Sequence, residues 1–471
     1  MNVYVKIEIL DRELEGRLLL AMTAAERGHD VLLGTMSALL SHRLWLSPGI
    51  YHDKSLTPKP GKVALHRRLA DAGFAVTSQD EESGLKQPDY APFARRRFSA
   101  ETFATASAAL TWGPHDTAAL TGAYSDWADR LRMTGSPRVD LWRRELRDLH
   151  RRPDGRPDLP GVDPDRPVVL FAPGSIPFRP NDFWTMIADA RPRQFKDDDD
   201  PREWSHYTAH ATAFAYTGRL VRAVRLAARA LPDAQIVVRP HPKSADGAWE
   251  AVLGPLPDNV RVTREGSSGR WVAGANVLVH NGSTTGVEAA AGGVAVVSFQ
   301  PHGEGADLFT NRVGDVAGDE DALIRIIGDA LRARHGQSGG PDAAERRTLE
   351  VLGERFTALE GRLAVDRIVD VWDELDAPGR RRPNRVRPAL LLSGLHRRAG
   401  RVRTAAGRRR AGTRGDRGAI DVSGKFPPLD RGALGTIAEG LRRTLGRFDG
   451  VEVEPVGRHL AHVRPRTRGR S

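Results

Sequence analysis

Val3-Tyr-Val-Lys-Ile-Glu-Ile9 is followed by a helical pattern over residues 12–27 and by Gly28-His-Asp-Val-Leu-Leu33, and this succession decides the fold class. The first run alternates and is rich in β-branched residues, which predicts a strand; the last run predicts a second strand. A helix that ends at a glycine before an apolar strand is typical of parallel α/β sheets, because a parallel crossover needs a helix between its strands. We therefore expect a doubly wound α/β domain.

The same alternation continues along the chain. Residues 63–72 predict a helix and Phe74-Ala-Val-Thr-Ser78 a strand, so residues 1–160 form the first expected domain. A turn-rich, charged stretch ends it. A second domain, over residues 166–376, starts with the strand Pro167-Val-Val-Leu-Phe-Ala172. Its other expected elements are a helix at 218–230 and strands at 235–239, 277–280 and 294–299.

Charge and cysteine content limit the function classes. The 471-residue chain has no cysteine and a net charge of +11. Residues 377–471 hold 24 Arg and Lys against 7 Asp and Glu, whereas residues 1–376 hold 47 against 53. The basic surface therefore belongs to the tail, and the acidic body argues against nucleic acid as the main partner.

The tail is expected to differ from the body. We expect residues 377–424 to be a largely disordered Arg-rich linker and residues 425–471 to be a small appended α/β segment, read as a helix and then a strand. No apolar run is long enough to span a membrane, and the N-terminus lacks a signal pattern. We expect a cytoplasmic protein whose tail could contact the anionic inner face of the cell membrane; a solvated tail without a partner is the alternative.

The stretch Val237-Val-Arg-Pro-His-Pro242 predicts a strand that ends in Arg and His between two prolines. Open parallel sheets bind their ligands at the carboxyl ends of the strands. Arg239 could donate to a phosphate as a fork-shaped cation, and His241 could donate a hydrogen bond or a proton. With Pro242 they form one candidate site. The alternative is a His buried beneath a loop.

Val277-Leu-Val-His-Asn-Gly-Ser-Thr-Thr-Gly-Val-Glu-Ala-Ala-Ala291 predicts a buried strand, a turn and a small-residue helix. A helix N-terminus with Gly, Ser and Thr offers backbone N–H groups, hydroxyls and the positive end of the helix dipole to an anion. We expect the nucleotide phosphate here; the alternative is that Ser283 or Thr284 only caps the helix. The candidate donor-binding residues are Gly282, Ser283, Thr284, Thr285 and Glu288, with Gly174 and Ser175 in the matching turn after residue 172.

Three carboxylates, Asp80, Glu81 and Glu82, follow an expected strand in Thr77-Ser-Gln-Asp-Glu-Glu-Ser-Gly84. Like charges so close raise one another's pKa, so one of them could act as a proton acceptor or donor. A solvated acidic loop is the alternative.

Weaker candidates for binding an anionic substrate are Lys54 and Lys59, in the stretch 54–62, and Arg138, in Thr134-Gly-Ser-Pro-Arg-Val-Asp140. An exposed Pro-containing loop explains the two lysines equally simply. The four consecutive Asp residues at 197–200 are interpreted as a solvated loop, with a metal-binding cluster as the alternative, and no other ligand spacing predicts a metal site.

Taken together, these stretches resemble the bacterial surface carbohydrate biosynthesis proteins, a group similar to capsule Kdo transferases, bacterial sialyltransferases and CDP-glycerol glycerophosphotransferases. The resemblance covers residues 1–375 and implies a GT-B-like fold, with two doubly wound Rossmann-type domains facing a cleft. In the sialyl- and Kdo-transferase families an acidic pair followed by Gly, a His-Pro pair and a Ser-Ser or Ser-Thr pair surround the CMP-sugar. The matching pairs here are Glu81-Glu82, His241-Pro242 and Ser283-Thr284.

By this resemblance, Glu81 or a neighbour is the catalytic carboxylate, His241 contacts the leaving group, and Ser283 with Thr284 holds the CMP phosphate. Ser83 stands where the acidic motif has Gly, with Gly84 one position later, so the choice among Asp80, Glu81 and Glu82 stays open.

The resemblance implies a glycosyltransferase of surface polysaccharide synthesis that needs no cofactor beyond its nucleotide-sugar donor. The donor would be a CMP-activated acidic sugar such as Kdo, and the acceptor a glycan or a lipid-linked glycan. One alternative is a CDP-glycerol type glycerophosphotransferase, which shares the His-Pro and Gly-Ser-Thr-Thr elements. Another is a noncatalytic protein that binds membrane or nucleic acid through its basic tail.

Overall fold

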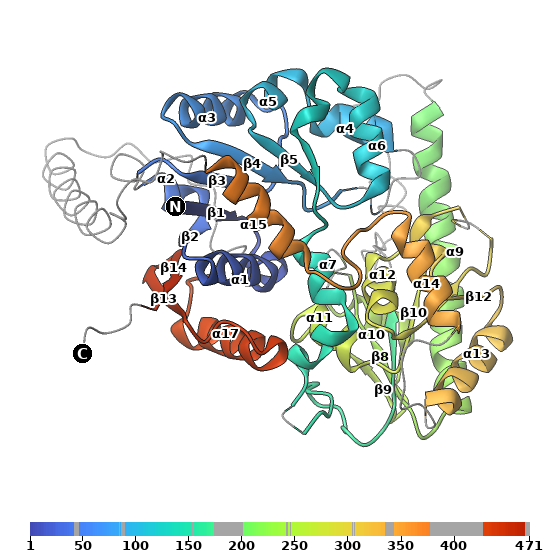
Figure 1. The fold of residues 1–471 in the computed structure, drawn as a ribbon. Coiled ribbons are helices and arrows are strands. Elements are labelled where there is room, and N and C mark those ends of the chain that lie inside the picture. Colours follow the sequence, from blue (N-terminus) through green and yellow to red (C-terminus); the bar gives the residue numbers. More distant parts are fainter. Residues whose placement is uncertain are drawn as a thin grey trace, which may run out of the picture. The chain divides into compact units, whose positions relative to one another are not determined.

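The computed structural model describes residues 1–41, 47–83, 85, 90–152, 154–173, 201–241, 244, 246–303, 305, 307–334, 343–376 and 427–466. They form two compact α/β units (Figure 1). The first unit comprises described residues within 1–84, 89–141 and 353–471, and the second unit those within 85–88 and 142–352. Each unit is built around its own sheet.

The first unit contains an eight-stranded sheet in the order β13-β14-β2-β1-β3-β4-β5-β6. The strands pair in parallel from β2 to β6, and β14 pairs antiparallel with both β2 and β13. From β1 the chain first adds β2 on one side and then crosses to β3 on the other, so the strand order reverses between β1 and β3. The strands are β1 (Asn2–Ile7), β2 (Asp30–Thr35), β3 (Ile50–Asp53), β4 (Ala75–Gln79), β5 (Ala108–Thr111), β6 (Leu131–Met133), β13 (Val451–Gly457) and β14 (Leu460–Pro465).

The strand–helix–strand succession predicted for the first 33 residues is confirmed. β1 and β2 are buried along their whole length, as expected of parallel strands covered on both faces. The connecting helix α1 (Leu10–Glu26) carries Asp11 and Glu13 in its first turn, where the helix dipole favours negative charge. It ends before Gly28, whose φ of +89° is a backbone conformation that favours glycine.

Helix α1 lies between α15 (Ala364–Leu375) and α17 (Arg431–Leu445) (Figure 1). The buried Asp140 carboxylate caps α15 by accepting the backbone N–H groups of Ala364 at 2.8 Å and Val365 at 2.9 Å. The remaining helices of this unit are α2 (Met36–Leu40), α3 (Pro60–Asp71), α4 (Tyr90–Arg97), α5 (Ala100–Thr105), α6 (Pro114–Ala123), η1 (Ser125–Arg130) and α7 (Pro137–Trp142), which runs up to the boundary between the units.

The second unit contains a six-stranded parallel sheet in the order β12-β11-β10-β7-β8-β9. From β7 the chain adds β8 and β9 on one side and then crosses to β10 on the other. The strand order therefore reverses between β7 and β10. The strands are β7 (Val168–Ala172), β8 (Gln235–Val238), β9 (Val260–Val262), β10 (Val277–His280), β11 (Ala295–Phe299) and β12 (Asp315–Ala317).

Helices cover this sheet as well. Apolar residues of α9 (Pro201–Ala230), α10 (Ala248–Leu253) and α13 (Glu320–Arg334) share one core with the strands, including Val277 and Val279 of β10. Because successive strand residues point to opposite faces, His280 points away from that core and toward α12 (Thr284–Ala291). The other helices are α11 (Ser268–Gly274), α14 (Ala343–Gly353), η2 (Arg144–His150) and η3 (Phe309–Asn311).

The boundaries between the units differ from the expected domains. Residues 142–160 group with the second unit, because Arg147 of η2 donates to the carbonyl oxygens of Ala273 at 3.0 Å and Gly292 at 3.2 Å. Residues 353–376 return to the first unit, where Trp372 of α15 donates through Nε1 to Thr77 Oγ1 at 3.2 Å.

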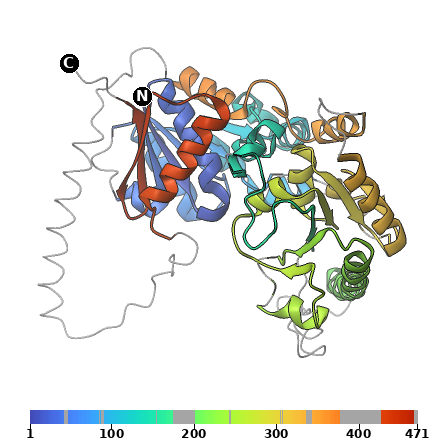
Figure 2. The same cartoon turned by 90° about the horizontal axis from the view of Figure 1, so that it is seen from below.

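The expected appended segment, 425–471, is an integral part of the first unit over its described residues. It is a helix followed by two strands, not one, and β14 extends the sheet beside β2 (Figure 2). Arg447, after α17, bridges Glu26 of α1 at 2.6 Å and Asp366 of α15 at 3.0 Å. The unpaired edge of β2 explains the addition, because an exposed strand edge accepts a further strand.

Several predictions fall on residues outside the described ranges: Gly174, Ser175, Pro242, the Asp run at 197–200 and the linker at 377–424. Among the helices that the structure describes, none is both long enough and apolar enough to cross a bilayer.

Candidate functional site

The turn between β10 and α12 carries most of the predicted donor-binding residues. Ser283 is the N-cap of α12, and its side chain accepts the N–H of Thr285 at 3.2 Å. Gly282 has φ of +67°, a conformation suited to glycine, and its N–H donates to Asn311 Oδ1 at 2.6 Å. Thr284 and Thr285 are partly exposed at the first helical positions. The N-terminus of α12 thus combines the glycine, the hydroxyl groups and the backbone N–H groups that are typical of an anion-binding site.

Asn311 of η3 is a site residue that sequence reasoning missed. Besides accepting from Gly282, it donates to Asn281 Oδ1 and to the Gly305 carbonyl oxygen, both at 2.8 Å. These bonds fix the turn that precedes α12. No spacing rule signals such a residue, because Asn311 meets the turn only in three dimensions.

Two residues near this turn are buried in the packing. Glu288, a predicted donor-binding residue, lies in the second turn of α12 and is only 6% exposed. His280 is fully buried, and neither of its ring nitrogens has a hydrogen-bond partner among the described residues. Burial lowers the pKa of His280 to about 4, so the ring is neutral at pH 7. It packs beneath α12 and does not supply a cation to the site.

Gly286 makes that packing possible, and Gly286→Ala is expected to lower the free energy of unfolding of the second unit by about 2 kcal/mol. A Cβ atom at Gly286 would lie 2.3 Å from His280 Nε2, and the buried ring has no space to retreat. Urea unfolding measures the effect. In the matched control Gly218→Ala, the new Cβ on α9 meets no atom within 4 Å, so helix propensity alone should stabilise by about 1 kcal/mol. Equal effects at the two glycines would contradict the steric argument.

Arg239 and His241 follow β8. In the sheet, β8 is two strand positions from β10, so the ends of these two strands are about 10 Å apart along the sheet edge. Arg239 donates to the carbonyl oxygens of Glu265, at 2.9 Å, and Gly266, and its guanidinium lies 5.9 Å from the centre of the Trp271 ring. The structure therefore directs Arg239 to the loop before α11. Burial lowers its pKa, yet the group stays a cation. His241 is partly buried directly after the strand end.

The acidic loop of the first unit separates its three carboxylates. Asp80 is buried and pairs with Arg97, with Nη2 at 2.7 Å and Nε at 2.9 Å. Glu81 is buried and pairs with Arg17 of α1. Glu82 is about half exposed and lies 3.5 Å from Arg12 Nη1. Each carboxylate of the predicted cluster therefore lies beside an arginine, and Arg97 is also 4.0 Å from Glu82.

Burial, not repulsion among neighbours, dominates the pKa of Asp80. Desolvation raises the pKa, the Arg97 cation opposes that rise, and the charge of Glu82 is the smallest contribution. The expected mutual shift between like charges is therefore present but minor. The cause could not be found in the sequence, because Arg97 and the burial of the loop arise from folding.

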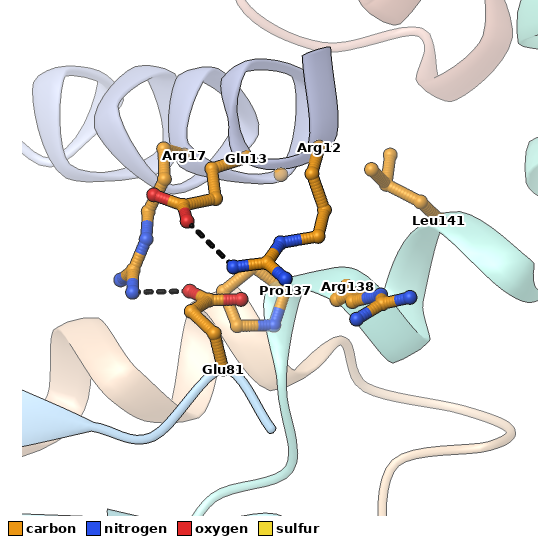
Figure 3. Close-up of a pocket in the computed structure, with 8 residues that line it drawn as sticks. Arg12, Glu13, Arg17, Glu81, Pro137, Arg138 and Leu141 are labelled. Carbon is orange, nitrogen blue, oxygen red and sulfur yellow. Dashed lines mark hydrogen bonds and ion pairs between the residues drawn. The ribbon is translucent and has the colours of Figure 1, made fainter. Parts of the chain in front are cut away.

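Of the three, Glu81 lines the pocket shown in Figure 3, and Asp80 and Glu82 are not among the residues that line it. The pocket belongs to the first unit, near the point where its strand order reverses after β1. Figure 3 shows Arg12 and Arg17 reaching from α1 toward Glu81, with Arg138 of α7 on another wall. Its lining residues are Arg12, Glu13, Gly16, Arg17, Glu81, Pro137, Arg138 and Leu141.

The two predicted lysines are placed differently from each other. Lys54 Nζ lies 2.8 Å from Glu8 Oε2 and 4.0 Å from Glu13 Oε1, so its charge is already matched by carboxylates. Lys59 is exposed and precedes α3, where it makes no side-chain capping bond. Neither lysine lines the pocket, whereas the third predicted cation, Arg138, does.

Comparison with known proteins gives structural likeness only. No family model and no curated protein matches the chain. One similar solved structure is the UDP-GlcNAc 2-epimerase of Methanocaldococcus jannaschii, with 12% sequence identity over 79% of this chain and 100% of that chain and a TM-score of 0.49. A second is the wall teichoic acid polymerase TagF, with 10% identity over 79% of this chain and 88% of that chain and a TM-score of 0.48. A third is the S. aureus MnaA–UDP structure, with 12% identity over 80% of this chain and 97% of that chain and a TM-score of 0.42. The chain itself has the two doubly wound α/β units that the GT-B-like prediction requires.

Among the residues that the structure describes, no group of three or more His, Asp or Glu side chains is arranged to hold a metal ion.

Proposed function

We propose that the chain is a transferase of bacterial surface carbohydrate synthesis that uses a nucleotide-activated donor, with a CMP-linked acidic sugar as the leading candidate. The observation that carries the proposal is the Ser283-capped N-terminus of α12 at the strand-order reversal between β7 and β10. In open α/β sheets, ligands bind at such reversals, outside the carboxyl ends of the strands. The donor phosphate would lie there.

The groups around this turn support an anionic ligand. The hydroxyls of Ser283, Thr284 and Thr285 and the positive end of the α12 dipole face a part of the unit that is open to solvent. The turn is held rigid by Asn311. A rigid set of donors loses little freedom when the ligand binds, which favours affinity. His241, at the end of β8, is proposed to contact the leaving group.

We propose Glu81 as the catalytic carboxylate. It is the member of the acidic loop that lines a pocket, whereas Asp80 is enclosed with Arg97 and Glu82 lies toward solvent. The ion pair with Arg17 fixes the orientation of the Glu81 carboxylate, as a proton acceptor requires. This proposal selects Glu81 from the three carboxylates among which Ser83 and Gly84 left the choice open.

A CDP-glycerol type glycerophosphotransferase is the second candidate function. It would use the same turn, because a diphosphate also binds at a helix N-terminus. Both reactions release CMP, but the donor of the sugar transfer carries a CMP group, whereas the donor of the phosphotransfer carries a CDP group. The intact CDP moiety should therefore bind more tightly than CMP only in the second case.

The test is thermal stabilisation of the full chain by CMP, CDP, UDP and GDP. A nucleotide present at about 100 times its Kd stabilises the unit that binds it by about 2.7 kcal/mol, which raises Tm by roughly 5–10 °C. CMP selectivity supports a CMP-sugar donor, and CDP selectivity supports the phosphotransferase. Stabilisation by none of the four nucleotides would contradict a nucleotide donor site.

The variant Ser283→Gly tests the assigned turn. Glycine is an acceptable N-cap, so the free protein should lose only a few tenths of a kcal/mol while the hydroxyl is removed. The Tm shift with nucleotide is expected to fall by at least half. Ser267→Gly is the matched control, because Ser267 caps α11 in the same way by accepting the Arg270 N–H at 3.3 Å. An equal loss in both variants would place the nucleotide elsewhere.

A further inference from the structure

The pocket of the first unit has the position expected of a ligand site. It lies beside the first turns of α1, directly after β1, where the strand order reverses between β1 and β3. The pocket belongs to the first unit, whereas the α12 turn belongs to the second unit. Sequence reasoning assigned only Glu81 and Arg138 among its lining residues, and it did not connect them.

Arg17 is the feature that calls for a ligand. Its side chain is only 1% exposed, and although Nη2 pairs with Glu81, neither Nη1 nor Nε has a hydrogen-bond partner among the described residues. A buried guanidinium with unmatched N–H groups is costly unless another acceptor approaches. The pocket is the space from which an acceptor can reach Arg17 (Figure 3).

Arg12 and Arg138 bring two more guanidinium groups to the same pocket. Arg12 pairs with Glu13 at 3.1 Å and lies 3.5 Å from Glu82, and its Nε also has no hydrogen-bond partner among the described residues. The pocket lining thus carries three guanidinium groups and two carboxylates. Planar guanidinium groups match the oxygens of a phosphate in pairs.

The two carboxylates restrict the ligand further. Glu13 and Glu81 each accept from an arginine and present further lone pairs on the pocket wall. A bare anion would be repelled by them, whereas a ligand that also carries hydroxyl groups can donate to them. The lining therefore matches one molecule with both an anionic group and neighbouring hydroxyls.

We infer that this pocket binds a phosphorylated polyol or sugar, with the phosphate on Arg12, Arg17 and Arg138 and the hydroxyls on Glu13 and Glu81. Such a molecule would be the phosphate-bearing end of the acceptor. Only the role of this molecule as part of the acceptor rests on the proposed function. Its binding depends on the first unit alone. Nucleotide stabilisation, which tests the second unit, and phosphate-ester binding can therefore fail independently.

The experiment is isothermal titration of the full chain with sn-glycerol 3-phosphate, glucose 6-phosphate, inorganic phosphate and glycerol. We expect at least one phosphate ester to bind more tightly than inorganic phosphate, and glycerol not to bind. In Arg12→Gln the affinity for the ester should fall about tenfold or more, as for the loss of a charge-assisted hydrogen bond. Arg17→Lys, which keeps the charge opposite Glu81, should weaken the same binding.

Arg27→Gln is the matched control. Arg27 is the C-cap residue of the same helix, is 28% exposed like Arg12, and pairs with the carboxylates of Asp366, Asp370 and Asp373, but it lies outside the pocket. Its replacement should leave ester binding unchanged. Absence of ester binding, equal losses in Arg12→Gln and Arg27→Gln, or inorganic phosphate binding as tightly as both esters would each overturn the inference.

Discussion

Asp53→Ala is expected to lower the free energy of unfolding of the first unit by about 4 kcal/mol, the largest effect of any single substitution considered. Asp53, at the carboxyl end of β3, is fully buried. Its carboxylate lies 3.0 Å from Lys6 Nζ, 3.3 Å from Lys62 Nζ and 2.9 Å from His66 Nε2. Its removal leaves two lysines without their shared counter-charge in a buried site, and an unmatched buried charge is strongly destabilising.

The pKa shifts in this cluster also show that Lys62 and Asp53 stabilise one another's charges. Burial lowers the pKa of Lys62 to about 8, even though the nearby Asp53 carboxylate favours the charged form of the lysine. Burial by itself would raise the pKa of Asp53, but the hydrogen bond with His66 and the charges of the two lysines hold that pKa well below its usual range. A carboxyl whose folded pKa is depressed contributes stability that is present above its unfolded value, near 4, and is lost as pH falls below that value. Neutral pH is therefore the condition in which the substitution has its full effect.

Urea unfolding at pH 7 measures the loss. The control is Glu101→Ala, because Glu101 also pairs with a cation, Arg67 at 3.1 Å, but is 58% exposed and is expected to contribute less than about 1 kcal/mol. If Asp53→Ala were no more destabilising than Glu101→Ala, the network would be solvated in the folded protein, and the carboxyl end of β3 would have to be open to water.

The early strand–helix–strand unit was predictable because its signals are local. The alternation in β1, the apolar run in β2 and the turn at Gly28 each depend on neighbours within a few residues. The Ser283 cap of α12 is local in the same sense, since a hydroxyl before a helix meets the N–H groups that follow it. In both cases the partner of each residue lies close in the sequence.

The misplaced features depend on residues far apart in the sequence. Arg17 and Glu81 are 64 positions apart, and Asp140 caps a helix that begins more than 200 positions later. The return of α15 and the addition of β14 beside β2 have no local signal, because the free edge of β2 exists only once the sheet has formed. The tail's charge was correctly located, but its charge alone could not indicate that residues 427–466 complete a sheet.

His280 gives the second large effect, a loss of about 3 kcal/mol of second-unit stability as pH falls from 7.5 to below 4. The ring is fully buried and lacks hydrogen-bond partners among the described residues, and burial lowers its pKa from 6.5 to about 4. In the unfolded chain the same imidazole takes up a proton near pH 6.5. Between pH 6.5 and 4 the unfolded state therefore binds more protons, so stability is complete above 6.5 and declines as pH falls.

Comparison with His280→Leu isolates this contribution, because every other titrating group is common to the two proteins. Leucine is close to histidine in size and cannot take up a proton, so the variant should be within about 1.5 kcal/mol of the natural protein at pH 7.5. Urea unfolding at pH 7.5, 6, 5 and 4 should show the natural protein losing about 3 kcal/mol more than the variant over that range. Parallel pH profiles would mean that water reaches the imidazole beneath α12. The N-terminus of α12 would then be less rigid than the packing of Gly286 on His280 and the hydrogen bond of Gly282 to Asn311 indicate.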